Sequence, residues 1–82
     1  MSKNNGILIT VKFFATLRKF GPAEEMIKLV EGSTVKSIFD KYKIPKEERR
    51  TIILVNGRPH HDLKTILQNG DIIAIFPPIG GG

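Results

Sequence analysis

Apolar and polar residues alternate along the first ordered segment that the sequence predicts. Between residues 7 and 14 the odd positions are apolar, and Thr10 and Lys12 occupy the opposite face, which is the period of a half-buried strand. Phe14 then falls on the polar face, where a core residue is not expected. The predicted buried set of this strand is Ile7, Ile9, Val11 and Phe13.

Similar patterns predict strands at residues 25–30, 51–55 and 71–76, with a short return arm at 58–61. Asn56 and Gly57 both tolerate positive φ, so they predict a tight type I′ turn before the return arm.

One segment has the period of a helix instead. Its apolar residues recur at i, i+3, i+4 and i+7, namely Val35, Ile38, Phe39 and Tyr42. Ser33 or Thr34 is suited to cap its first turn, and Pro45 prevents it from continuing. Short helical turns are expected at residues 15–20 and 63–67, and a polar loop at 45–50.

The predicted order is strand, strand, helix, strand, short strand, strand, which indicates an α+β fold with one helix across one face of the sheet. With 82 residues the chain forms one domain, at residues 7–76, between a flexible segment at 1–6 and an extended tail at 77–82.

The other sheet face carries apolar residues that the helix does not cover. If Ile73 and Ile75 point to the helix, then Ile72, Ala74 and Phe76 point outward, as Phe14 and Leu54 do. An exposed apolar patch of this kind usually marks a partner site. The alternative is a one-residue shift in register, which would bury this set.

Composition removes several classes of function. The chain has no cysteine, which excludes disulfides, thiolate metal sites and cysteine nucleophiles. Its net charge of +5 is spread along the sequence without interleaved aromatic residues, so these charges are expected to form an ordinary solvated surface. Attraction to an acidic partner protein is the second interpretation and is favoured over nucleic-acid binding. No apolar run is long enough to cross a membrane, and no signal peptide is expected at the start, so a cytoplasmic protein is predicted.

The remaining polar clusters do not form a recognisable catalytic or metal site. His60 and His61 are adjacent on an extended segment, so they point to opposite faces, and no further histidine or cysteine completes a ligand set. The acidic pairs at 24–25 and 47–48 have no facing partner, and no phosphate-binding loop is present. The chain is therefore expected to bind no cofactor and to depend on another enzyme for any ATP-driven step.

The last six residues suggest a different kind of chemistry. Pro77 and Pro78 favour a stiff, extended stalk, and Gly80, Gly81 and Gly82 have no Cβ to prevent passage through a narrow channel. At about 3.3 Å per residue the tail reaches roughly 18–20 Å, which is enough to enter the active site of another protein. The carboxylate of Gly82 is then the group presented for reaction; a frayed end or a cloning remnant is the alternative.

The segments Val11–Arg18, Glu31–Val35, Leu54–Arg58 and Gly70–Gly82 resemble the small subunit of molybdopterin synthase. The ending Phe-Pro-Pro-Ile-Gly-Gly-Gly is the specific part of the resemblance, and the related sulfur carrier of the thiamine pathway typically lacks the Phe-Pro-Pro stalk. The resemblance implies a β-grasp, ubiquitin-like fold with a mixed sheet of four to five strands. It also implies contacts with partners at Phe14 and Phe76, and at Pro59 in a position that is often apolar.

The resemblance further implies a sulfur carrier that is not itself an enzyme. Gly82 would be adenylated by an ATP-consuming enzyme similar to those that activate ubiquitin, and then converted to a thiocarboxylate. The large catalytic subunit of molybdopterin synthase would receive the tail and use its sulfur to build the dithiolene of molybdopterin. Three alternatives stay open: a sulfur carrier for thiamine, tRNA or cysteine synthesis, a protein modifier joined to lysines through Gly82, and, ranked low, a basic nucleic-acid-binding module.

Overall fold

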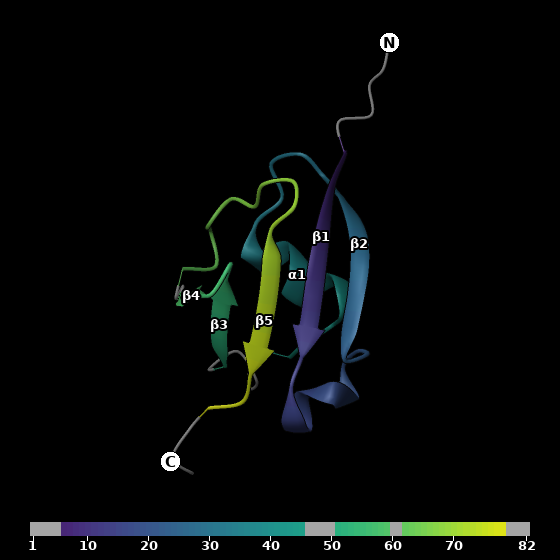
Figure 1. Ribbon diagram of the computed structural model, residues 1–82, viewed down its shortest axis with the longest axis vertical. Coiled ribbons are helices and arrows are strands. Elements are labelled where there is room, and N and C mark those ends of the chain that lie inside the picture. The colour runs from purple at the N-terminus through teal and green to yellow at the C-terminus, as the bar shows by residue number, and fades with distance from the viewer. Residues whose placement is uncertain (1–5, 46–50, 60–61, 79–82) are drawn as a thin grey trace.

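The computed structural model describes residues 6–45, 51–59 and 62–78. Figure 1 shows a single twisted sheet with one helix packed behind it. The elements in chain order are β1 (Gly6–Phe13), the 3₁₀ helix η1 (Ala15–Lys19), β2 (Glu24–Val30), α1 (Val35–Lys41), β3 (Ile52–Val55), β4 (Arg58–Pro59) and β5 (Ile72–Phe76).

The five strands lie in the order β2-β1-β5-β3-β4. β1 pairs antiparallel with β2 but parallel with β5, and β3 pairs antiparallel with both β4 and β5. The first and last strands of the chain therefore lie side by side in the middle of the sheet (Figure 1). A mixed five-stranded sheet with one helix on one face confirms the expected α+β, β-grasp fold.

The core lies between the sheet and α1. The residues predicted to face inward from β1 and β5 are nearly inaccessible to solvent, and Ile38 and Phe39 of α1 are fully buried against them. The buried apolar residues of the sheet are Ile7, Ile9, Val11, Phe13, Ile27, Ile53, Val55, Ile73 and Ile75. The alternation in the sequence therefore assigned the two faces of the sheet correctly.

Local hydrogen bonds fix both ends of α1. At its start, the Thr34 amide donates to Oγ of Ser37 at 3.0 Å, which satisfies one backbone group outside the helical ladder. At its end, the Ile44 amide donates to the carbonyl of Phe39 at 2.9 Å, and the Lys43 amide donates to that of Asp40 at 3.1 Å. This pair of bonds is a Schellman motif, and it requires the positive φ of 56° at Lys43.

The turn between β3 and β4 has the predicted form. Asn56 and Gly57 have φ values of 53° and 83°. The Asn56 side chain also ties this turn to β5, because its Oδ1 accepts from the Ile72 amide at 2.9 Å and its Nδ2 donates to Asp71 at 2.8 Å. The turn is thereby held against the start of the last strand.

The helical turn expected over residues 63–67 is only partly present. A single turn is closed by the Thr65 amide, which donates to the carbonyl of Asp62 at 3.1 Å. The chain then extends, because Ile66 forms an isolated bridge with Thr34 and the Leu67 amide donates to the Ser33 carbonyl at 2.9 Å. The prediction that a helical turn continues to Leu67 is wrong, since pairing with the start of α1 replaces it. Most of the predicted loop at 45–50, and the end of the return arm at 60–61, lie outside the described residues.

Candidate functional site

The tail leaves the fold from the end of β5, the central strand of the sheet. β5 is held on one side by β1 and on the other by β3, so its last residue, Phe76, is anchored in the sheet. Pro77 follows it half-buried and Pro78 exposed, and neither belongs to a strand. Gly80, Gly81 and Gly82 lie outside the described residues, so the threading role of the tail and the chemistry of Gly82 stay predictions.

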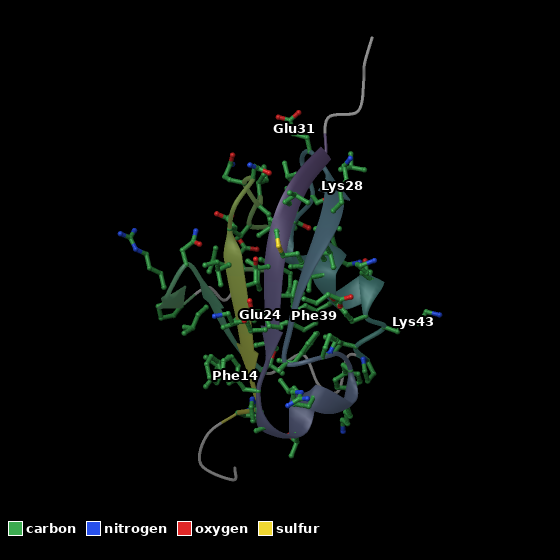
Figure 2. All side chains as sticks on the ribbon, turned by 45° about the vertical axis from the view of Figure 1, so that its right-hand side comes forward. Phe14, Glu24, Lys28, Glu31, Phe39 and Lys43 are labelled. Carbon is green, nitrogen blue, oxygen red and sulfur yellow. The ribbon has the colours of Figure 1, made fainter. Side chains whose placement is uncertain are left out.

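Two aromatic rings stack at the base of the tail. The ring centroids of Phe14 and Phe76 lie 4.2 Å apart with an interplanar angle of 10°. The parallel register of β1 and β5 causes this contact. Phe13 lies opposite Ile75, so the residues that follow them, Phe14 and Phe76, lie side by side on the opposite face of the sheet. The Phe14 amide donates to the Ile75 carbonyl at 3.1 Å, and Figure 2 shows Phe14 at the end of β1 beside the end of β5.

The backbone turns sharply directly after Phe14. Ala15 has a φ of 56°, a left-handed conformation that costs a residue with a Cβ roughly 1–2 kcal/mol. The chain then enters η1, where Leu17 is buried in the core with an exposed fraction of 1%. The turn and the buried anchor leave the Phe14 ring on the outside of the sheet, with an exposed fraction of 38%.

Further apolar side chains surround this aromatic pair on the face that α1 does not cover. Ile52 of β3 lies opposite Phe76, and Leu54 lies opposite both Ala74 of β5 and Pro59 of β4. Ile72 is exposed to 43%, Pro59 is exposed, and Ile52, Leu54, Ala74 and Phe76 are half-buried. We call this set the open-face patch; it consists of Phe14, Ile52, Leu54, Pro59, Ile72, Ala74 and Phe76.

The structure thus brings together all the residues that the sequence singled out for a partner surface. The outward direction that alternation predicted for Phe14, Leu54, Ile72, Ala74 and Phe76 is confirmed, and the alternative register that would bury them is wrong. Ile52 was missed, although the alternation along residues 51–55 already placed it on the same face as Leu54. Leu8 and Met26, exposed to 47% and 64%, extend the apolar area of this face toward β2.

The polar candidates do not converge on a site. Oδ1 of the exposed Asp62 accepts from the Lys64 amide at 2.8 Å and so caps a local turn, while His60 and His61 lie outside the described residues. Among the residues that the structure describes, no three histidine, aspartate or glutamate side chains are placed to hold a metal ion. In the same part of the chain, no helix is long and apolar enough to span a bilayer.

Glu25 forms a hydrogen bond that supports the fold. Its Oε1 accepts from the Tyr42 hydroxyl at 2.7 Å, which joins β2 to the end of α1. Burial raises the pKa of Tyr42 above its ordinary value, and the hydrogen bond and negative charge of Glu25 raise it further. This contact explains one member of the acidic pair at 24–25 without a catalytic role.

Comparison with known proteins gives the family. The model of the ThiS family matches residues 11–82, which is most of the chain. The chain belongs to the ThiS family. Its members are small carrier proteins and not catalysts, which places this chain among the ubiquitin-like sulfur carriers and modifiers. A search of curated proteins by sequence finds no match.

Solved structures show the same fold at low identity. A protein named as subunit 1 of a molybdopterin converting factor from Pyrococcus furiosus is 30% identical, with a TM-score of 0.73 over 89% of this chain and 99% of its own. Small archaeal modifier protein 1 from Methanosarcina acetivorans is 28% identical, with a TM-score of 0.67 over 96% of this chain and 100% of its own. A complex of subunits 1 and 2 of the molybdopterin converting factor from Helicobacter pylori matches at 22% identity, over 93% of this chain and 100% of that one, with a TM-score of 0.65.

Proposed function

We propose that this protein is the sulfur-carrying small subunit of molybdopterin synthase, with Gly82 as the residue that carries the sulfur. The observation that supports this most directly is the stacked pair of Phe14 and Phe76 at the base of the Pro77–Pro78 stalk. An apolar surface at the base of the tail allows a partner to hold the domain and receive the tail in one binding event. The reaction itself then takes place in the partner.

The chemistry begins with a carboxylate that lacks a leaving group. An ATP-dependent adenylyltransferase of the ubiquitin-activating type would join AMP to the Gly82 carboxylate and release pyrophosphate. Sulfur at the oxidation level of sulfide would then displace AMP, which leaves a thiocarboxylate. Gly80 and Gly81 serve this step because the absence of a Cβ lets catalytic groups approach the acyl carbon closely.

The large catalytic subunit of molybdopterin synthase would next receive the loaded tail. There the sulfur forms a bond to the pterin precursor, and water replaces it on the acyl carbon, which restores the carboxylate. The complex of subunits 1 and 2 of the molybdopterin converting factor from Helicobacter pylori supports this pairing, since its chain of matching fold is in complex with the other subunit. On this proposal both partners contact the open-face patch through Phe14, Leu54, Pro59, Ile72 and Phe76.

A second candidate is a protein modifier, in which Gly82 forms an isopeptide bond with a lysine. The 28% identity to small archaeal modifier protein 1 from Methanosarcina acetivorans supports it almost as well as the 30% identity to the converting-factor subunit supports the first. Both roles use the same activation of the C-terminal carboxylate. The Phe-Pro-Pro stalk, which carries the resemblance to the synthase subunit, favours the first.

Intact-mass analysis of protein isolated from its native cell tests the two against each other. A sulfur carrier gives a population in which sulfur replaces one oxygen of Gly82, whereas a modifier gives conjugates of higher mass. The thiocarboxylated protein is then mixed with the large subunit from the same cell and the pterin precursor, and formation of molybdopterin is expected.

Deletion of Gly82 is the matched loss-of-function variant. It should abolish sulfur transfer and leave the thermal unfolding midpoint unchanged, because the core is formed by residues of the sheet, η1, α1 and the connecting segments. Lys64→Ala, an exposed change on a loop, serves as the control and should keep full activity. Molybdopterin formation by the chain without Gly82 would refute the proposal.

A further inference from the structure

The edge of the sheet farthest from β4 is formed by β2, a strand of seven residues. Its partner β1 covers only one side, and no described strand pairs with the other (Figure 1). An edge strand of this length presents a row of backbone groups to which another strand can add. The opposite edge is much shorter, because β4 has two residues.

The register shows which backbone groups are free. The Phe13 amide donates to the Ala23 carbonyl at 3.1 Å, so the odd-numbered residues of β2 bond to β1 in the antiparallel ladder. The even-numbered residues therefore turn their amides and carbonyls to the outer edge. These are Glu24, Met26, Lys28 and Val30, and their side chains lie on the open face of the sheet.

The charged side chains of β2 are complementary to those of β2 in a second copy of the protein. If a second copy pairs antiparallel about Met26, each Glu24 faces the Lys28 of the other copy, and Met26 faces Met26. Both charged side chains are exposed, and neither forms an ion pair with another residue in the described part of the chain. Directly opposite unlike charges stabilise a strand pair, whereas registers shifted by two residues place these charges opposite apolar residues.

We propose that two copies of this protein associate through β2, which joins their sheets into one continuous sheet. About six backbone hydrogen bonds form, since each of the three central residue pairs exchanges two. Met26, exposed to 64%, becomes covered by its own counterpart at the centre. A lysine on an edge strand normally prevents such pairing, but here it is neutralised in one register and so selects that register.

This association is independent of the proposed sulfur chemistry. The tail continues β5, and β1 lies between β5 and the β2 edge, so each copy keeps its own tail available. Deletion of Gly82 should therefore leave the self-association unchanged. A failure of either proposal does not affect the other.

Sedimentation of the full chain over a concentration series tests the interface. The wild-type mass should rise from 9.2 kDa toward twice that value. Lys28→Glu alone, or Glu24→Lys alone, replaces attraction by repulsion on both sides of Met26 and should weaken association by about tenfold or more. Lys64→Glu carries the same change in charge on an exposed loop and should associate like the wild type.

The decisive sample is an equal mixture of the two charge variants. Each Glu of one variant then faces a Lys of the other, so association should return to the wild-type level in the mixture and not in either variant alone. A wild-type protein that stays at 9.2 kDa over the whole series overturns the proposal. Equal association of all variants also overturns it, because a different face would then be responsible.

Discussion

The stacked rings of Phe14 and Phe76 join β1 to β5 outside the core, and their coupling can be measured. Phe14→Ala and Phe76→Ala each remove one ring, and the double variant removes both. With a centroid distance of 4.2 Å and nearly parallel planes, the pair should contribute about 0.5–1.5 kcal/mol beyond the burial of its area. Each single change should cost about 1–2 kcal/mol in total, because both rings stay partly exposed.

Urea denaturation of the four proteins gives the coupling energy. The double variant should be less destabilised than the sum of the single variants by about 1 kcal/mol, since the contact is lost only once. In thermal unfolding a difference of that size corresponds to roughly 4–8 °C for a domain of this length. All four proteins should unfold with the same dependence on urea concentration, which shows that the compared states are the same.

A control cycle pairs Phe14→Ala with Ile66→Ala. Ile66 is an exposed apolar residue bridged to Thr34. Thr34 follows the end of β2 that pairs with the start of β1, whereas Phe14 follows the other end of β1. Its effect should add to that of Phe14→Ala within about 0.3–0.5 kcal/mol. If the Phe14–Phe76 cycle is equally additive, the stacked contact does not hold the two strand ends together in solution and the inferred stacking at the base of the tail is refuted.

Three further changes test local features. Gly21→Ala should destabilise the fold by about 1–3 kcal/mol in urea denaturation, because the new Cβ overlaps Cε2 of the buried Phe13 ring and lies 2.8 Å from its Cδ2. Gly6→Ala, where the nearest atoms belong to the flexible Lys28 side chain, should change stability by less than about 0.5 kcal/mol. Similar costs for both variants would contradict this packing. Lys43→Gly should raise the free energy of unfolding by roughly 0.5–1 kcal/mol, and the unfolding midpoint with it, because glycine adopts the positive φ of the Schellman motif without strain. Lys43→Ala should give no such gain. Because the pKa of Tyr42 is raised in the folded protein, the unfolded chain loses the hydroxyl proton at lower pH than the folded one. The contribution of the protonated hydroxyl to stability is therefore complete below about pH 10 and is lost as the pH rises further. Wild type should therefore lose stability above pH 10 more steeply than Tyr42→Phe, and identical curves would exclude the hydrogen bond to Glu25.

The sequence predicted the strands well because each has a short, local pattern. Alternation from Ile7 to Phe13 identified the buried face of β1, and Asn56–Gly57 identified the turn after β3 through its backbone requirement. The turn near Leu67 was overestimated because its outcome depends on Thr34, a residue far away along the chain. A local pattern carries no information about such a partner.

In the candidate site, too, the features set by a local pattern were predicted and those set by distant pairing were not. The outward direction of Phe14 and Phe76 followed from period two in each strand. Their stacking did not, because it depends on the parallel pairing of β1 with β5, which joins the two ends of the sequence. Ile52 enters the open-face patch through the pairing of β3 with β5, so the strand order had to be known before the patch could be outlined in full.

The parallel pairing of β1 and β5 also determines how the protein withstands force. β5 passes to the tail at one end of the sheet, and β1 begins at the other (Figure 1). Tension applied between the tail and the start of β1 therefore acts along these two strands in shear, so that their hydrogen bonds bear the load together and do not open one after another. The pairing that places the tail beside the first strand therefore also places the whole β1–β5 ladder between the tail and the start of the chain's first strand.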